Sequence, residues 1–176
     1  GHGISVSAIQ MASAVSAIAN DGILMKPYIV KQIVNQNDQP VKRFKPQKIR
    51  RAVSARTAEI VKNIMKTVIT EGGTGVNAAL DGYSVCGKTG TSRKLDKNGQ
   101  YSDNRHTASF IGFTPADNPE IAVIVVIDEP KGKYYGGIVA APVFKQIAQQ
   151  TLNYLNVPPD NDTTKFRVFL GREANG

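Results

Sequence analysis

The stretch Gly82-Tyr-Ser-Val-Cys-Gly-Lys-Thr-Gly-Thr-Ser92 decides the fold of this chain. In an alternating strand, Cys86 and Lys88 of this stretch would lie on one face. Asn98-Gly99 follows soon after, and this pair is a strong hairpin signal between two strands. Two further β-rich runs come next, joined by a turn of Pro, Ala, Asp, Asn and Pro. We therefore predict three neighbouring antiparallel strands, at about 83–92, 106–114 and 121–128.

Apolar residues at helical spacing predict helices before and after these strands. Ser7 and Gln10 form a capping-box pattern, and the apolar spacing that follows ends at Asn20-Asp21-Gly22. Two more helices are expected at about 54–70 and 141–155. The predicted fold class is α/β of the α+β type, an antiparallel sheet flanked by helices.

Length and composition indicate one globular unit. The chain has 176 residues, the size of a single domain. Because a sheet of three strands is small for a complete domain, we expect residues 1–157 to be part of a larger one, cut out of a longer protein. Residues 158–176 are expected to form a loosely ordered polar tail. The longest apolar run, Ile121 to Ile127, is too short to cross a bilayer.

The net charge of +8 is concentrated between residues 42 and 51. We expect a solvated connector there, with contact to an anionic polymer or membrane surface as the alternative. No nucleic-acid-binding module accompanies it, so no nucleic-acid partner is predicted. The single cysteine, Cys86, excludes an internal disulfide and is expected to be a packed strand thiol. With only two histidines and one cysteine, neither a metal site nor a cofactor is predicted.

Gly82 to Thr89 also matches the phosphate-loop pattern G-x-x-x-x-G-K-[ST]. A phosphate loop needs a helix that begins at the lysine, because the helix N-terminus binds the phosphates. The glycines and turn residues after Lys88 oppose such a helix. Only the apolar run that ends at Asp128 favours this interpretation, since it resembles a strand with a magnesium-binding aspartate. A phosphate-loop NTPase stays as the remote alternative.

Several motifs in order carry a family resemblance. Residues 1–22, 82–92, 106–130 and 134–144 resemble the C-terminal part of the transpeptidase domain of class B penicillin-binding proteins. The likeness runs from about Gly1 to Pro159 and is strongest to the division-specific septal transpeptidase. Lys88-Thr89-Gly90-Thr91 corresponds to the K-T-G-T signature, which serine β-lactamases share.

The family's chemistry needs an S-x-x-K motif with the nucleophilic serine, an S-x-N motif, and the K-T-G strand. Here no serine is followed three residues later by lysine. Ser102-Asp103-Asn104 spells S-D-N, but it follows K-T-G, whereas the family's motif precedes it, so we interpret it as a chance match. We expect the nucleophile to lie N-terminal to Gly1 and the isolated segment to be inactive.

The resemblance implies roles for the K-T-G-T residues. Lys88 is a fixed cation that attracts a substrate carboxylate, and the Thr89 and Thr91 hydroxyls donate hydrogen bonds to it. Gly90 lets a peptide lie close against the strand. The family also implies that the Thr91 N–H forms half of an oxyanion hole. Lys88 and Thr91 are thus the candidate catalytic residues.

Tyr134 and Tyr135 complete the candidate substrate-binding set with Lys88, Thr89, Gly90 and Thr91. In the family, aromatic residues at this point help to wall the acyl pocket. The alternative is that these tyrosines lie on the surface of a glycine-rich loop.

By resemblance, the parent protein cross-links peptidoglycan stem peptides during cell division through an acyl-serine. Its implied partners are the D-Ala-D-Ala end of the stem peptide, β-lactams and cell-division proteins. The implied location is the periplasmic face of the inner membrane, through an anchor upstream of Gly1. Self-association of the segment through its open sheet edge is also expected. The alternatives are a non-catalytic penicillin-binding sensor and a β-lactamase or carboxypeptidase relative.

Overall fold

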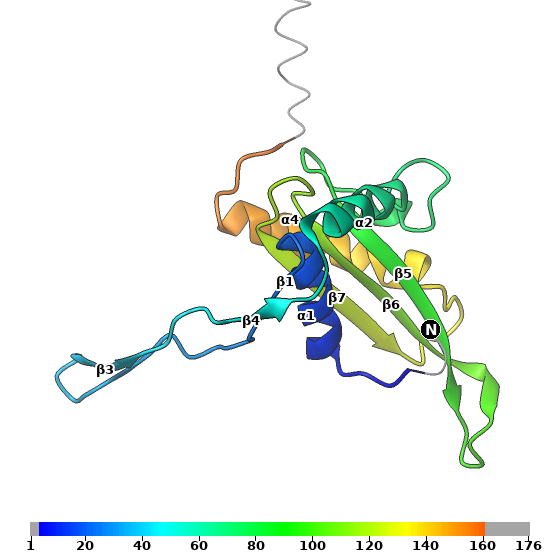
Figure 1. Cartoon of the computed structure of the whole chain (residues 1–176). Helices are drawn as coiled ribbons and strands as arrows, with labels where there is room; N and C mark the ends of the chain where they lie inside the picture. The colour runs from blue at the N-terminus through cyan, green and yellow to red at the C-terminus, as the bar shows by residue number, and fades with distance from the viewer. Residues whose placement is uncertain (1–3, 161–176) are drawn as a thin grey trace, which may run out of the picture.

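The computed structural model describes residues 4–160. Figure 1 shows its helices and strands. In chain order they are α1 (Ala8–Ala19), β1 (Ile23–Met25), β2 (Gln32–Val34), β3 (Pro40–Arg43), β4 (Lys48–Arg51), α2 (Ala55–Thr67), the short 3-10 helix η1 (Val76–Ala78), β5 (Cys86–Leu95), β6 (Tyr101–Thr114), β7 (Ile121–Asp128), α3 (Gly136–Val139) and α4 (Ala141–Tyr154). The last 16 residues of the predicted tail lie outside the described range. Within it, Asp160 accepts a hydrogen bond from the Ser84 amide at 2.7 Å.

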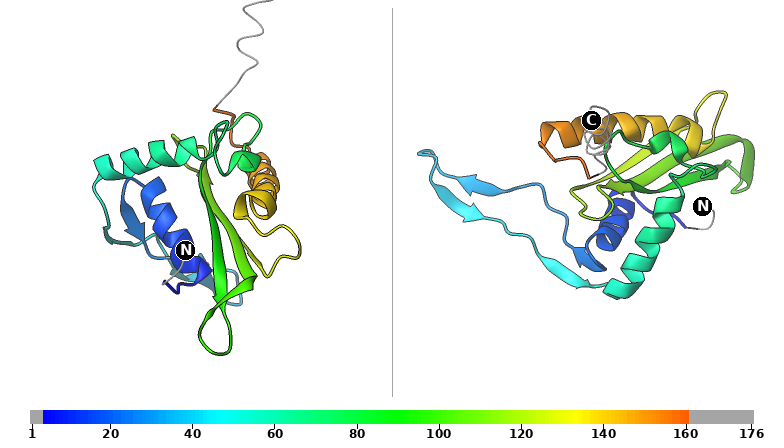
Figure 2. Two further views of the ribbon diagram at one scale, coloured as in Figure 1. Left: turned by 90° about the vertical axis from the view of Figure 1, so that its right-hand side faces the viewer. Right: turned by 90° about the horizontal axis from the view of Figure 1, so that it is seen from above.

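The sheet β5–β6–β7 is the middle layer of the molecule, with helices on both faces (Figure 2, left). Helices α1 and α2 cover one face, and α3 and α4 cover the other. This arrangement confirms the predicted antiparallel sheet flanked by helices. The capping box is also present, because the Gln10 amide bonds the Ser7 hydroxyl while the Gln10 side chain bonds the Ser7 amide.

The three predicted strands are present, but two of them have different bounds. β5 runs from Cys86 to Leu95 rather than from 83 to 92, and β6 begins at Tyr101 rather than at 106. The hairpin extends pairing to Leu95 and Tyr101, because the Asp96 carboxylate accepts the amides of Asn98 and Gln100 and tightens the turn. In the described sheet β5 has a partner only in β6, so it is an edge strand.

Each face of the sheet has its own apolar core. On the α4 side, the rings of Phe110 and Phe144 are fully buried, with centroids 4.8 Å apart. On the α1 and α2 side, Cys86, Phe113 and Met65 form a second buried cluster. Burial of these side chains from both faces fixes which residues of β5 and β6 point to each side.

The basic region predicted as a connector belongs to a hairpin arm. β2 pairs with β3 in an arm that extends away from the body, and β1 pairs with β4 at its base (Figure 2, right). Residues 42–51 are exposed apart from Phe44, as expected of a solvated segment. They are nevertheless not a plain connector, because 42–43 end β3 and 48–51 form β4. Among residues 4–160, no helix is long and apolar enough to span a bilayer.

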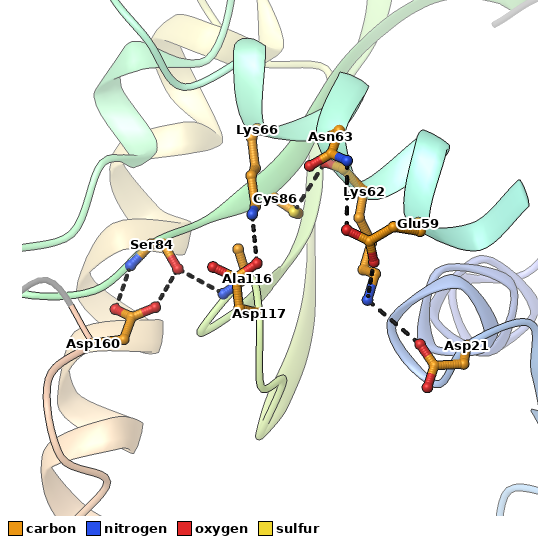
Figure 3. Close-up of polar contacts among 10 residues, drawn as sticks. All are labelled: Asp21, Glu59, Lys62, Asn63, Lys66, Ser84, Cys86, Ala116, Asp117 and Asp160. Carbon is orange, nitrogen blue, oxygen red and sulfur yellow. Dashed lines mark hydrogen bonds and ion pairs between the residues drawn. The ribbon is translucent and has the colours of Figure 1, made fainter. Parts of the chain in front are cut away.

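Polar contacts fasten α2 to the sheet around Cys86 (Figure 3). The Cys86 thiol donates to the Lys62 carbonyl oxygen at 3.3 Å. The Lys62 side chain is 8% exposed, and its ammonium pairs with Glu59 at 2.8 Å and with Asp21 at 3.4 Å. These carboxylates, the Glu59 hydrogen bond first, raise the pKa of Lys62 above its ordinary value despite burial. A buried charge needs such partners to be tolerated.

We expect Cys86 to be unreactive in the folded protein. Its thiol is fully buried, and burial raises its pKa to about 12, so the reactive thiolate is not populated at neutral pH. A disulfide reagent should modify Cys86 only after denaturation, as measured by peptide mapping. Lys97→Cys supplies an exposed thiol at the hairpin tip as the control. Equal modification rates at the two positions in folded protein would contradict this prediction.

Candidate functional site

The candidate site lies on β5, where Lys88, Thr89, Gly90 and Thr91 occupy consecutive positions of the edge strand. Each pairs with β6 on one side, in register from Ile111 to Ala108. The strand continues past Lys88 to Leu95, so no helix begins at the lysine. The phosphate-loop alternative is therefore wrong. An edge strand that faces outward can receive an extended peptide as an additional strand.

Lys88 is an exposed cation on this edge. Its ammonium donates to the Thr89 carbonyl oxygen at 2.8 Å and approaches the Thr89 hydroxyl at 3.3 Å. Among residues 4–160, no carboxylate lies within ion-pair distance of it. Its charge thus remains available to an anionic group at the strand edge.

The Thr91 hydroxyl is oriented by the start of α3. The Gly136 amide donates to Thr91 Oγ1 at 3.1 Å. This contact needs two adjacent glycines, because a Cβ at Gly136 would overlap the Ser109 carbonyl oxygen and one at Gly137 would overlap the Thr74 carbonyl oxygen. The glycines therefore act as close-packing residues, and both are buried.

The Thr89 hydroxyl meets a residue that the sequence analysis did not identify. Thr74 Oγ1 lies 3.1 Å from Thr89 Oγ1. Thr74 lies in the stretch Glu71-Gly-Gly-Thr-Gly75, between α2 and η1. Nearby, the Asn77 side chain donates to the Gly137 carbonyl oxygen at 2.8 Å and joins this loop to α3. No motif marks Thr74 or Asn77, so only the folded chain identifies them.

Tyr134 lies against β6, and Tyr135 packs on Tyr134. The Tyr134 ring stacks on His106, with centroids 4.0 Å apart and planes at 13°. Tyr135 packs against Tyr134 with centroids 4.6 Å apart, and it is 59% exposed. Because His106 pairs with Arg93, two residues beyond Thr91, the aromatic stack lies near the end of the K-T-G-T segment. His106 was not predicted to belong to this site.

A charge cluster holds the loop that carries the tyrosines. Glu129 accepts hydrogen bonds from Arg105 at 2.6 Å and from Lys94 at 2.8 Å. Lys94 also pairs with Asp128 at 2.8 Å. Asp128 ends β7 and Glu129 begins the turn that follows, so both carboxylates serve as ion-pair partners of the β5–β6 hairpin.

The Ser102-Asp103-Asn104 match lies in the outer part of β6 and is mostly exposed. The Asp103 carboxylate pairs with Arg93 across the hairpin at 2.9 Å. Its surroundings are those of hairpin surface residues.

We expect the Glu129 carboxyl to titrate near pH 2. The Arg105 hydrogen bond, followed by the one from Lys94, lowers its pKa from 4.5 to about 2. Because the folded-state pKa is depressed, this group stabilises the fold above about pH 4.5, and the contribution is lost as pH falls toward 2. Carbon-detected NMR titration should show that Arg105→Gln moves the midpoint upward. Lys131→Gln, which removes a nearby charge from the same loop, should leave it close to 2; an unchanged midpoint in Arg105→Gln would refute the assignment.

The comparisons with known proteins agree with this geometry. Residues 1–149 match the family of the penicillin binding protein transpeptidase domain. The chain is 44% identical over 169 residues to the probable peptidoglycan D,D-transpeptidase PenA of Neisseria gonorrhoeae, covering 96% of this chain and 27% of that protein. It is 38% identical over 183 residues to the peptidoglycan D,D-transpeptidase FtsI of Escherichia coli K12, covering all of this chain and 29% of that one.

A solved structure shares the fold. The crystal structure of penicillin-binding protein 3 from Mycobacterium tuberculosis, complexed with aztreonam, superimposes with a TM-score of 0.81 at 35% identity. The match covers 90% of this chain and 37% of that one. The chain therefore spans less than a third of the two curated relatives and little more than a third of the solved chain. On these matches and on its own sheet and K-T-G-T strand, the chain belongs to the transpeptidase domain family of class B penicillin-binding proteins.

Proposed function

We propose that the parent protein is a serine-type peptidoglycan D,D-transpeptidase and that this chain supplies its substrate-binding wall. The observation that carries the proposal is the Lys88 ammonium on an open strand edge, which has no carboxylate partner among residues 4–160 and lies beside two threonine hydroxyls held by neighbouring groups. This arrangement suits an extended peptide that ends in a carboxylate, such as a stem peptide with D-Ala-D-Ala. β-Lactams carry an anionic group in the same place and would bind there too.

In this mechanism the peptide adds to β5 as a strand, and its carboxylate contacts Lys88, Thr89 and Thr91. A serine N-terminal to this chain attacks the carbonyl carbon of the penultimate D-Ala, and the terminal D-Ala leaves. The Thr91 N–H is one of two donors to the oxyanion, and such a donor is typically worth about 2.7–4 kcal/mol of barrier. The acyl group then passes from the serine to an amine of a second stem peptide, and the serine hydroxyl is released. Tyr134 and Tyr135 wall the acyl group.

The nucleophile is assigned to the parent because residues 1–176 contain no S-x-x-K. The isolated chain should accordingly form no penicillin adduct on a serine. We further propose that the parent acts at the septum during cell division, with division proteins as partners. Its proposed location is the periplasmic face of the inner membrane, held by an anchor outside this chain.

Fluorescent-penicillin labelling of the parent, with peptide mapping of the adduct, tests the proposal. A long-lived adduct on a serine N-terminal to Gly1, together with cross-linking of stem peptides, is the expected result. A long-lived adduct without cross-linking would instead indicate a sensor, and rapid release of hydrolysed penicillin would indicate a β-lactamase. Absence of any adduct on folded protein would overturn the assignment.

A further inference from the structure

The Thr89 hydroxyl has two polar side-chain neighbours. Thr74 Oγ1 lies 3.1 Å away and Lys88 Nζ lies 3.3 Å away. An ammonium only donates hydrogen bonds, so Lys88 occupies one acceptor position of Thr89 Oγ1. Between Thr74 and Thr89, either hydroxyl can be the donor.

The direction of the hydrogen bond between Thr74 and Thr89 determines whether the Thr89 hydroxyl can donate to a ligand. A hydroxyl carries one proton and two acceptor lone pairs. When Thr89 donates to Thr74, its proton is used inside the protein and cannot reach a ligand. When Thr74 donates to Thr89, both acceptor positions of Thr89 are filled and its proton points to an outside acceptor. Hydrogen bonds to an ionised acceptor are roughly twice as strong as neutral ones, so a bound carboxylate selects the second arrangement.

Thr74 is well placed to donate to Thr89 because its backbone is held on both sides. The next residue, Gly75, donates its amide to the Val68 carbonyl oxygen at 2.9 Å, and a Cβ there would lie only 2.8 Å from the Phe110 ring. On the other side, Gly137 packs directly on the Thr74 carbonyl oxygen. The Thr74 hydroxyl therefore has a defined position relative to β5, although its side chain is exposed.

Thr91 provides an independent parallel. Its Oγ1 accepts from the Gly136 amide, which is a donor only, so this contact leaves the Thr91 proton available to an outside acceptor. Each of the two threonines of the strand thus has a hydrogen-bond partner in a neighbouring loop. For Thr91 the partner is a backbone donor, whereas for Thr89 it is the Thr74 hydroxyl, and either hydroxyl of that pair could be the donor.

We propose that Thr74 is a positioning residue that donates to Thr89 and so directs the Thr89 proton to the carboxylate of the substrate. The proposal rests on the proposed function, because it assigns Thr74 to the carboxylate subsite of that same site. Thr74 itself does not touch the reacting atoms. It acts only through the orientation of Thr89.

The test compares penicillin G with its methyl ester on the full-length parent. The ester lacks the negative charge that the Thr89 proton would meet, so it serves as the matched ligand. The measurement is the second-order rate constant of acylation for both ligands in wild type, Thr74→Val and Thr74→Ser. The ratio of the two constants from one preparation is independent of the folded fraction, so a loss of stability cannot imitate the effect.

We expect Thr74→Val to lower acylation by penicillin G about tenfold, the size of one hydrogen bond to a charged group. The methyl ester should react at nearly the wild-type rate, and Thr74→Ser should restore the ratio. An equal decrease for both ligands leaves the ratio unchanged and would mean that Thr74 only shapes its loop. That result would overturn the proposal, as would no decrease for either ligand. Failure of wild type to react with either ligand would instead contradict the proposed function.

Discussion

Lys88→Ala in the parent protein is expected to lower the second-order rate constant of acylation by penicillin about 100-fold. The Lys88 ammonium is an exposed cation of the strand edge, and no carboxylate among the described residues neutralises it. Its loss removes one charge-assisted hydrogen bond to the ligand carboxylate, worth about 1.5–3 kcal/mol, together with longer-range attraction. Stopped-flow or gel-based labelling over a concentration series measures the constant.

Lys97→Ala is the matched control for the loss of one positive charge. Lys97 lies exposed in the turn between β5 and β6, on the same hairpin as Lys88. Its substitution should leave acylation within about twofold of wild type, because interactions between exposed charges are weak. Equal effects of the two substitutions would show that general electrostatic attraction, rather than a defined contact of Lys88, favours the ligand.

Gly137→Ala is expected to disrupt the site although it removes no functional group. The added Cβ would overlap the Thr74 carbonyl oxygen and lie 3.3 Å from Thr89 Cγ2. To avoid this overlap, α3 and the Thr74 loop must separate, which disturbs the 3.1 Å bond from Gly136 to Thr91 and the 3.1 Å contact of Thr74 with Thr89. Overpacking of this kind costs about 1–3 kcal/mol of the free energy of unfolding. We expect that loss in urea unfolding, with acylation by penicillin lowered at least about tenfold.

Gly132→Ala is the control that distinguishes the effect of the overlap at Gly137 from the effect of ordinary backbone strain. Gly132 precedes the same tyrosines and has a φ of +82°, but no atom lies within 4 Å of an added Cβ. Its substitution should cost about 1 kcal/mol through the backbone conformation alone and should spare acylation. The close packing of Gly137 would have no functional role if both variants acylated equally well.

The central sheet could be predicted because its signals are local. Asn98-Gly99 marks the hairpin, and the apolar runs before Thr114 and Asp128 are typical of buried strands. The outer part of β6, from Tyr101 to Arg105, has no such signal, since its residues are mostly polar; pairing with β5 is present at its two ends, from Tyr101 to Leu95 and from His106 to Arg93. Strand β3 reads Pro-Val-Lys-Arg and is exposed throughout, so no apolar alternation identifies it.

The candidate site was predictable only along the strand itself. The K-T-G-T residues are consecutive, so a motif identifies them. Their orienting partners are not, because Thr74 lies 15 positions before Thr89 and Gly136 lies 45 after Thr91. A lone threonine between glycines has no pattern of its own. His106 is similar, because its stacking on Tyr134 depends on where the loop after β7 returns to β6.

The hydrogen bond from the Gly136 amide to Thr91 has a consequence for drug resistance. A backbone donor survives the replacement of a side chain, so no single substitution deletes it without moving the chain. Under the proposed function, drug and substrate also share the Lys88, Thr89 and Thr91 contacts. Substitutions that remove these contacts therefore also impair the cross-linking of stem peptides. Selection by antibiotics is therefore expected to act on the groups around this strand, such as the Tyr135 ring, which is 59% exposed.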